Sequence, residues 1–293
     1  MKKQKTVSIK AKLLGVIIPV VIAIVVVLVV AAYQISAGTI KKYSQNLLQS
    51  SVENQASQIE AWLNENLASF QMAKTIIEDL KPSDEELKTI LDGYYGYNSN
   101  YPEGLYVADS TGQLITASES TKKESDVTNS TWYKEGLTRV NMAVGSAYQN
   151  ADGVNVISAS GILNDGSDKV RVISADMTLD RIAIIVNSFI EMNDAEAFLV
   201  DKTSGVILAN RDSSLISQTL GAEGQSHFYQ LTAEKAAEKD YNFATLDGNM
   251  TVFQEVDGTN WLLISYIPTS IVLSDLTQLR NIMIVISVIC IAL

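Results

Sequence analysis

An uncharged apolar run near the start of the chain constrains the fold more than any other feature. Leu13 to Tyr33 contains no charged residue. A helix rises 1.5 Å per residue, so about 20 such residues span the roughly 30 Å hydrocarbon core of a membrane. The apolar core of a secretory signal peptide is about 7 to 15 residues long and is followed by a cleavage site. The run here is longer and continues into a helical pattern, so we expect a transmembrane helix at residues 13–33.

The two ends of the chain indicate its orientation in the membrane. Residues 1–12 contain five lysines and no acidic residue, and the positive-inside rule places such a segment in the cytoplasm. Ile282 to Leu293 is apolar, but as a helix it would cover only about 18 Å. We therefore expect residues 269–293 to form a connecting helix and the truncated start of a second span. We expect the protein in the cell membrane (the inner or plasma membrane), with the region between the spans on its extracytoplasmic side.

The region between the apolar ends is strongly acidic. With the five leading lysines and Arg280 set aside, 16 of the 22 basic residues remain against 33 acidic residues. Nucleic acids and anionic membrane surfaces require a basic face, so neither is expected as a partner of this region.

Few residues are available for redox, metal or hydrolytic chemistry. Cys290 is the single cysteine and His227 the single histidine. No disulfide can form within the chain, and neither a Cys and His metal cluster nor the usual hydrolase constellations can be assembled. We expect no cofactor, no metal and no enzymatic activity. A membrane-anchored extracellular hydrolase with paired carboxylates remains the enzyme alternative.

Residues 34–80 are predicted to form one long extracytoplasmic helix. Apolar residues recur there at spacings of three and four, which is typical of one helical face: Val52, Ala56, Ile59, Leu63, Leu67 and Phe70. This stripe either mediates dimerisation or packs against the chain's own domains. Pro82 ends the helix, and Ser83 and Glu86 have the spacing of a capping box that starts another.

The rest of the chain contains short strand-like runs that occur in two copies. "LYVADSTGQLITAS" matches "FLVDKTSGVILAN" with Asp109 and Asp201 in step, "TWYKEGL" matches "HFYQLTA", and "RVISADM" matches "LLISYIP", at separations of roughly 91 to 96 residues. A constant period indicates duplication of one α+β unit, an antiparallel sheet with packed helices. The predicted modules are residues 81–187 and 188–268.

Comparison of the two copies separates structural from functional residues. Trp132 and Tyr133 match Phe228 and Tyr229, which indicates that part of this aromatic pair is architectural. Asp176 aligns with Ile267 in the second copy, so its carboxylate is not explained by packing. The alternative is that Asp176 caps the helix that begins in "TLDRI".

This layout resembles the double Cache sensor family of bacterial transmembrane receptors over about residues 34–275. The resemblance implies a long N-terminal helix, two tandem PAS-like antiparallel-sheet modules between transmembrane helices, and a ligand in the membrane-distal first module. The amino-acid-binding pattern of the family has an Arg where this chain has Ser130 and an Asp where it has Asn150. The other implied ligand-binding positions are Trp132, Tyr133, Tyr148 and Asp176.

The chemistry of these positions indicates the class of ligand. Asp176 would accept charge-assisted hydrogen bonds from an ammonium group, each contributing about 1.5 to 3 kcal/mol, and the aromatic rings would enclose the cation. Ser130 cannot form the bidentate carboxylate clamp that an Arg forms, and Lys122 or Lys123 would replace it only as point charges. We therefore expect the ligand to be a small amine or a neutral polar molecule, and an amino acid is the next candidate.

The expected function is ligand sensing by a bacterial transmembrane receptor of the chemoreceptor type. A histidine kinase or a diguanylate cyclase with the same sensor region is the alternative. Expected partners are the small-molecule ligand, the membrane, a second copy in a homodimer, and cytoplasmic signalling proteins reached through an output domain beyond Leu293.

Overall fold

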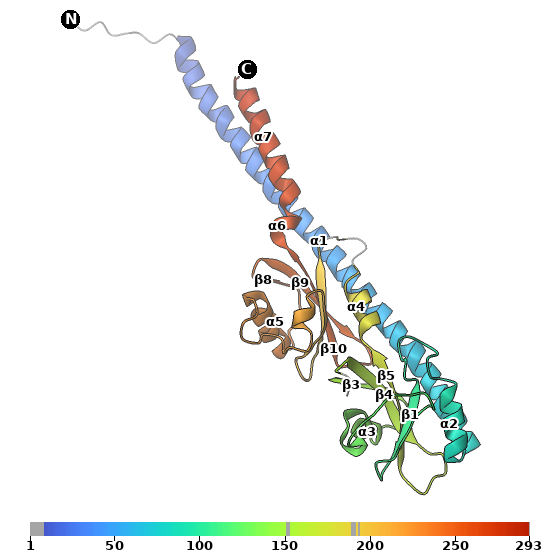
Figure 1. Ribbon diagram of the computed structural model, residues 1–293. Helices are drawn as coiled ribbons and strands as arrows, with labels where there is room; N and C mark the ends of the chain where they lie inside the picture. The colour runs from blue at the N-terminus through green and yellow to red at the C-terminus, as the bar shows by residue number, and fades with distance from the viewer. Residues whose placement is uncertain (1–8, 151–152, 189–191, 193, 293) are drawn as a thin grey trace, which may run out of the picture.

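The computed structural model describes residues 9–150, 153–188, 192 and 194–292. Helix α1 runs without interruption from Ile9 to Leu80, 72 residues, and includes Pro19. By length and composition it is the one helix among the described residues that could cross a membrane. Near the other end of the chain, α7 (Ser274–Ala292) lies beside the first part of α1 (Figure 1).

Two five-stranded antiparallel sheets follow α1, and they share one topology. The distal sheet has the order β2-β1-β5-β4-β3 and the proximal sheet the order β7-β6-β10-β9-β8. The distal strands are β1 (Leu105–Asp109), β2 (Leu114–Ile115), β3 (Ala143–Gln149), β4 (Asn155–Leu163) and β5 (Arg171–Thr178). The proximal strands are β6 (Glu196–Asp201), β7 (Ile207–Asn210), β8 (Ala244–Leu246), β9 (Asn249–Val256) and β10 (Trp261–Pro268). The predicted α+β fold with two sheet modules is confirmed.

Short helices connect and cover the sheets. Helix α2 starts at the predicted capping box, in which Ser83 and Glu86 bond each other's backbone N–H groups. Helices α3 and α5 occupy the same place in the two modules, and α4 leads from β5 towards the proximal sheet. The bounds are α2 (Asp84–Asp92), α3 (Thr131–Gly136), α4 (Asp180–Val186), α5 (His227–Ala237) and α6 (Thr269–Val272), with 3-10 turns η1 (Val127–Asn129) and η2 (Ser213–Leu215).

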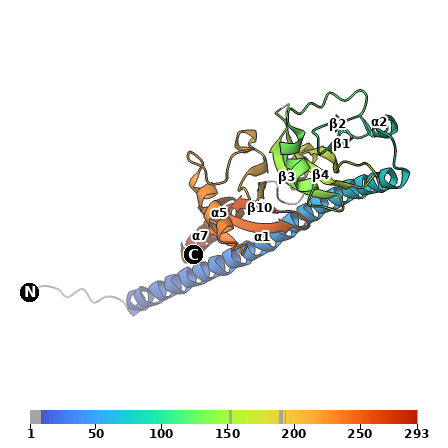
Figure 2. The same ribbon diagram turned by 90° about the horizontal axis from the view of Figure 1, so that it is seen from below.

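The apolar stripe of α1 packs against the chain's own modules. Val52, Ala56, Ile59, Leu63 and Phe70 are buried, and both sheets lie along one side of the helix (Figure 2). Of the two roles expected for this stripe, packing against its own modules is therefore the observed one. Dimerisation, if it uses α1, must use another face.

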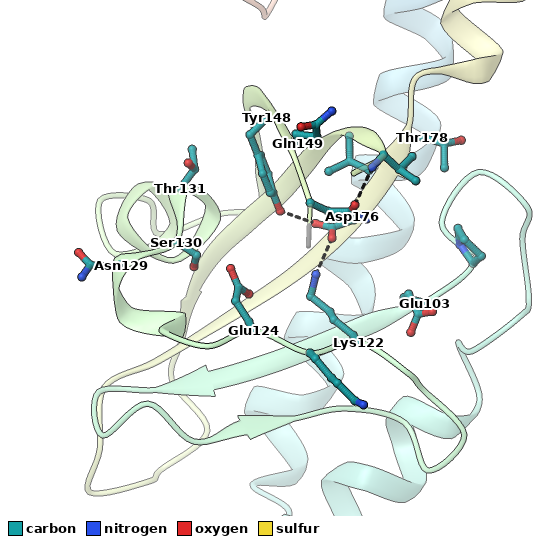
Figure 3. A pocket seen from close by; sticks show the side chains of 15 residues that line it. Glu103, Lys122, Glu124, Asn129, Ser130, Thr131, Tyr148, Gln149, Asp176 and Thr178 are labelled. Atoms are coloured by element: carbon teal, nitrogen blue, oxygen red, sulfur yellow. Dashed lines mark hydrogen bonds and ion pairs between the residues drawn. The ribbon is translucent and has the colours of Figure 1, made fainter. Parts of the chain in front are cut away.

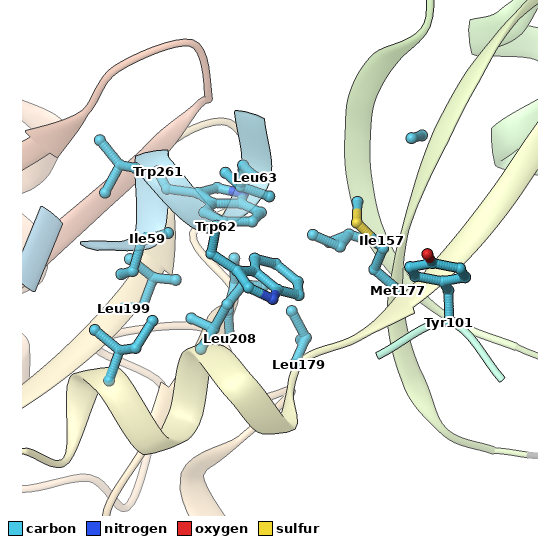
Figure 4. Close-up of a cluster of buried hydrophobic side chains, with 14 of the residues drawn as sticks. Ile59, Trp62, Leu63, Tyr101, Ile157, Met177, Leu179, Leu199, Leu208 and Trp261 are labelled. Carbon is cyan, nitrogen blue, oxygen red and sulfur yellow. The ribbon is translucent and has the colours of Figure 1, made fainter. Parts of the chain in front are cut away.

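One hydrophobic core extends along α1 through both modules. Trp62 of α1 lies between Leu208 of the proximal sheet and Leu179 at the end of the distal one (Figure 4). The amide of Gln55 donates hydrogen bonds to three backbone carbonyl groups at the end of α4. These contacts attach the two modules to α1 and so to each other.

The turn aspartates of the two repeats have the same role. Oδ1 of Asp109 accepts hydrogen bonds from the backbone N–H groups of Thr111 and Gln113. Oδ1 of Asp201 likewise accepts from the N–H groups of Thr203 and Ser204. Each carboxylate thus closes the turn after the first strand of its sheet, and the in-step alignment of these two aspartates is confirmed.

The register of the sheets corrects one pairing between the repeats. Arg171 of β5 lies opposite Asp109, and Trp261 of β10 lies opposite Asp201. Because the two aspartates correspond, Arg171 corresponds to Trp261, and the residues that follow them in β5 and β10 correspond one by one. The counterpart of Asp176 is therefore Tyr266, and the alignment of Asp176 with Ile267 is wrong by one residue. Side chains alternate between the two faces of a strand, so a slip of one residue selects the opposite face.

Candidate functional site

A cavity of about 440 Å³ opens in the distal module. It lies among β3, β4, β5 and the loop of residues 122–131 that leads into α3 (Figure 3). The structure brings four of the six predicted site residues to its lining: Ser130, Tyr148, Asn150 and Asp176.

Asp176 lies at the base of the cavity with its carboxylate held by four donors. Oδ1 accepts hydrogen bonds from the hydroxyl groups of Tyr106, Tyr148 (2.9 Å) and Ser158 (2.5 Å). Oδ2 accepts one from Nζ of Lys122 at 2.6 Å. The alternative that Asp176 caps a helix is excluded, because α4 begins at Asp180 and no side chain caps its N-terminus.

Lys122, the ion-pair partner of Asp176, is indicated by the sequence only as a possible point charge in place of the Arg of the family pattern. Its ammonium nitrogen also lies 4.2 Å from the centroid of the Tyr106 ring, a cation-π contact. The side chains of Lys122 and Asp176 are only 10% and 8% exposed. The two residues are 54 positions apart, and Lys122 lies in a loop without periodicity, so no sequence signal connected them.

The phenols beside Asp176 are neutral hydrogen-bond donors. Burial, followed by the negative charge of Asp176, raises the pKa of Tyr106 and of Tyr148 above the ordinary tyrosine value. The hydroxyl oxygens of Tyr148 and Ser158 lie 2.8 Å apart, and each has a single proton, which it donates to Asp176. The hydroxyl groups of Tyr106, Tyr148 and Ser158 therefore all point at one oxygen of the Asp176 carboxylate.

Trp132 and Tyr133 lie in a buried cluster behind the cavity, outside its lining. The Trp132 ring meets the Tyr106 ring edge-on at 4.9 Å between centroids. Its indole N–H donates to Oε2 of Glu124 at 2.9 Å. Burial raises the pKa of Glu124, and the hydrogen bond from Trp132 acts in the opposite direction. Trp132 thus contacts the cavity through Glu124, a lining residue that no pattern in the sequence indicated.

Ser130 and Asn150 both line the cavity. Ser130 is the N-cap residue of α3, and its hydroxyl donates to the carbonyl oxygen of Val127 at 2.6 Å. Oδ1 of Asn150 accepts a hydrogen bond from the backbone N–H of Val154 at 2.9 Å. Both side chains thus bond backbone groups of their own segments.

Aromatic side chains fill the corresponding place in the proximal module. The ring of Tyr266, the counterpart of Asp176, lies 4.4 Å from that of Phe228, the counterpart of Trp132. The Tyr266 hydroxyl donates to Glu196 at 2.5 Å. The polar constellation around Asp176 is therefore a property of the distal module.

The charged groups that line the distal cavity are of both signs. Glu103, Glu124 and Asp176 provide carboxylates, and Lys122 and Lys123 provide ammonium groups. No group of three or more His, Cys, Asp or Glu side chains suited to a metal ion occurs in the described part of the chain. The arrangement suits a small polar or charged organic molecule.

Solved structures of ligand-binding domains share this fold. The ligand-binding domain of Mlp24 with asparagine superimposes with a TM-score of 0.65 at 17% identity, covering 80% of this chain and 98% of that one. That of the Pseudomonas fluorescens chemoreceptor CtaA with L-isoleucine gives 0.64 at 20% identity, covering 82% and 98%. That of the Pseudomonas aeruginosa PAO1 amino acid chemoreceptor PctC with GABA gives 0.56 at 20%, covering 76% and 99%.

Sequence comparison assigns the family. No curated protein matches the chain. The family model dCache_1, described as a Cache domain, matches residues 32–276. This range includes both sheets, residues 32–80 of α1 and the start of α7. The chain therefore belongs to the double Cache domain family.

Proposed function

We propose that the region between the spans is the extracytoplasmic ligand-binding part of a bacterial transmembrane receptor of the chemoreceptor type. Its ligand is a small amine, amino acid or neutral polar molecule that binds in the distal module. One observation carries this proposal: the carboxylate of Asp176, held in place by three hydroxyl groups, faces a cavity of about 440 Å³. A carboxylate oriented in advance binds a small ligand without the cost of ordering it.

The comparisons support ligand sensing over catalysis. The solved neighbours are described as ligand-binding domains with asparagine, L-isoleucine or GABA. In this chain, the Asp176 carboxylate is engaged by four donors, and Glu124 by the indole of Trp132. A glycosidase needs one free acid and one free base across a cleft, so the engaged carboxylates favour binding over hydrolysis.

The proposed signal passes from the sheets to the membrane through a direct connection. Strand β10 ends at Pro268, and α6 follows at once and leads into α7 beside α1. A ligand shifts the balance between two conformations only through the difference in its affinity for them. Reversing a population ratio of 1:99 to 99:1 takes a difference of about 5.5 kcal/mol. The output is of the chemoreceptor type in this proposal, and a histidine kinase or diguanylate cyclase is the second candidate.

The proposed homodimer would use the face of α1 that points away from the sheets. Met72, Ile76 and Leu80 are exposed there at intervals of four residues, which places them on one side of the helix. Sedimentation of the full chain in detergent tests this part of the proposal. A strict monomer at high protein concentration would refute dimerisation and leave the ligand site unaffected.

A thermal-shift screen tests the ligand site. The full chain in lipid nanodiscs is screened against amino acids, amines, nucleobases and organic acids. We expect at least one amine, amino acid or neutral polar compound to raise the melting temperature, and Asp176→Asn to abolish that shift. Asp168→Asn, which neutralises an exposed aspartate outside the cavity, is the matched control. A shift that survives Asp176→Asn would place the ligand elsewhere, and hydrolysis of a glycan or peptide would favour the enzyme alternative.

A further inference from the structure

We propose that Lys122 is a tethered competitor for the ligand site: its ammonium group occupies the cation position at Asp176, and a ligand cation has to displace it. Lys122 thereby sets the ligand concentration to which the cavity responds, and its displacement releases the middle of the loop that carries it. This inference rests on the proposed ligand-sensing function and adds to it a regulatory contact at the same site.

The cation position consists of a carboxylate oxygen and an aromatic face. Nζ of Lys122 donates to Oδ2 of Asp176 at 2.6 Å and lies 4.2 Å from the centroid of the Tyr106 ring. Both groups attract an organic cation. Oδ1 of the same carboxylate already accepts hydrogen bonds from three hydroxyl groups. Oδ2 is therefore the atom through which Asp176 would bind a ligand cation, and the Lys122 side chain points at it (Figure 3).

A ligand cation and Lys122 exclude each other at this position. The side chains of Lys122 and Asp176 are only 10% and 8% exposed, and two ammonium groups on one oxygen atom repel each other strongly at a site so far removed from water. Asp176 supplies one negative charge, which compensates one cation. Glu124 is a poor second anion, because burial raises its pKa and its Oε2 atom already accepts the indole N–H of Trp132.

The loop that carries Lys122 is anchored on both sides of it. Residues 116–126, between β2 and η1, form no helix or strand. Ser118 bonds the last residue of α2, and Glu124 bonds α3. Between these anchors, the side chain of Lys122 joins the loop to β5. Displacement of Lys122 therefore breaks the contact of the loop with the sheet and leaves the two anchors in place.

A tethered competitor weakens binding by a predictable factor. A group on a short flexible linker acts at an effective concentration of the order of millimolar. The apparent dissociation constant of a ligand is its intrinsic value divided by the fraction of molecules whose site is open. If Lys122 covers Asp176 in about nine of ten molecules, the ligand therefore binds about tenfold more weakly than it would at the open site.

Chemical rescue tests whether Lys122 occupies a cation site. In Lys122→Ala, n-propylamine supplies the carbon atoms and the ammonium group that the substitution removes. The full chain in lipid nanodiscs, as wild type and as Lys122→Ala, is titrated at pH 7 with n-propylammonium chloride, with sodium chloride and with n-propanol, and the melting temperature is recorded. We expect n-propylammonium to stabilise Lys122→Ala at concentrations at least tenfold lower than those that stabilise wild type. Sodium chloride and n-propanol should not distinguish the two proteins.

Three further variants control the rescue. Asp176→Asn in the Lys122→Ala background removes the carboxylate and should abolish the rescue. Lys122→Arg keeps a cation at the position and should behave as wild type. Lys134→Ala removes an exposed lysine of α3 outside the cavity and should also behave as wild type. Equal stabilisation of wild type and Lys122→Ala by n-propylammonium, no stabilisation of either, or an equal rescue by n-propanol would refute the proposal.

Lys122→Met keeps most of the side-chain volume and tests the competition directly, also if Lys122→Ala does not fold. Each compound with an ammonium group that stabilises wild type in the thermal-shift screen is titrated calorimetrically into wild type and Lys122→Met. We expect Lys122→Met to bind it at least tenfold more tightly. Equal or weaker binding, or a screen in which only compounds without an ammonium group bind, would refute the competition and leave ligand sensing in place. If no compound of the screen binds either protein, ligand sensing fails and Lys122 has no ligand to compete with.

Discussion

Ser217 of the proximal module donates a hydrogen bond of 3.0 Å from its hydroxyl to Oδ1 of Asn155 in the distal module. Asn155 begins β4 and lies opposite Gln149 of β3. Beside this bond is a cavity of about 210 Å³ between the modules, and Tyr148, which also lines the ligand cavity, is part of its wall. Strand β3 thus has the proposed ligand on one side and the proximal module on the other.

Removal of this hydrogen bond should weaken the attachment of the two modules slightly. A typical hydrogen bond contributes about 0.5–1.5 kcal/mol, and this one is exposed, so we expect Ser217→Ala to lower the free energy of unfolding by about 0.5 kcal/mol. Denaturant titration of the full chain measures this change. Ser213→Ala, at another exposed serine of the same turn, is the control; equal effects of the two variants would show that the bond between modules contributes nothing.

Asp176→Asn should destabilise the distal module as well as abolish ligand binding. The amide keeps the size of the side chain but leaves the ammonium group of Lys122 buried without its counter-charge. Loss of one partner of a buried ion pair costs about 3–5 kcal/mol. The double variant Lys122→Met with Asp176→Asn should recover part of this loss, because it removes both charges. Denaturant unfolding of Asp176→Asn, Lys122→Met and the double variant, each compared with wild type, forms a double-mutant cycle. Additive changes in the free energy of unfolding would contradict the expected coupling.

The sequence predicted the architecture well because its signals are local or repeated. The apolar spacing of residues 52–70 predicted the stripe of α1, and the repeat predicted two sheets of one topology. The same repeat misassigned the counterpart of Asp176 as Ile267 in place of Tyr266. Similar strands align almost equally well at neighbouring offsets, and only the pairing with the adjacent strand distinguishes them.

The candidate site was predicted in part. Ser130, Tyr148, Asn150 and Asp176 meet at one cavity, and they were found through the family pattern and the unexplained carboxylate. Two groups that complete the site are joined to it by contacts across the fold: Tyr106 and Lys122 are 70 and 54 residues from Asp176. The third, Glu124, bonds the buried Trp132 from the irregular loop before α3. Contacts of that kind leave no periodicity in a single sequence.

Asp109 should make stability depend on pH in the acidic range. Burial alone would raise its pKa, but hydrogen bonds from Lys169 and Thr111 outweigh burial and lower the pKa from 3.8 to about 2. The folded state therefore favours the charged form. The stabilisation is fully present above pH 3.8 and is lost as the pH falls through about 2.

The size of this effect follows from the pKa difference. A shift of one unit corresponds to about 1.4 kcal/mol, so Asp109 contributes about 2 kcal/mol at neutral pH. Asp109→Asn should lower the free energy of unfolding by about that amount at pH 7 and by much less at pH 2. Denaturant titrations at pH 2, 4 and 7 measure it. A loss of the same size at all three pH values would show that the turn geometry, not the charge, is responsible.

Trp132 should contribute to stability by both its volume and its indole N–H. Its side chain is fully buried, so Trp132→Ala should cost about 3–5 kcal/mol. Trp132→Phe keeps most of the volume but leaves Glu124 without its donor, which should cost about 1–3 kcal/mol. In a Glu124→Leu background the cost of Trp132→Phe should fall, because no buried acceptor is then left unpaired. Thermal unfolding of these variants measures the difference; an equal cost in both backgrounds would contradict the role of the indole N–H.

Gly136 sets the distance between α3 and the distal sheet. A Cβ atom at this position would lie 2.3 Å from Cγ1 of Val172 and 3.2 Å from Cβ of Ser160. Val172 packs in the same buried cluster as Trp132, so a displaced α3 moves one wall of the cavity. Overpacking of this kind costs about 1–3 kcal/mol, which is the loss of unfolding free energy that we expect for Gly136→Ala.

Relief of the clash provides the control for Gly136→Ala. Val172→Ala removes the atom that the new methyl group would meet, so the double variant should be more stable than the sum of the two single effects predicts. Gly38→Ala, at a helical position with no atom within 4 Å of the added Cβ, should be neutral or stabilising by up to about 1 kcal/mol. If Gly136→Ala leaves both stability and ligand affinity unchanged, α3 is free to move away from the sheet, and its close packing at Gly136 does not hold the shape of the cavity.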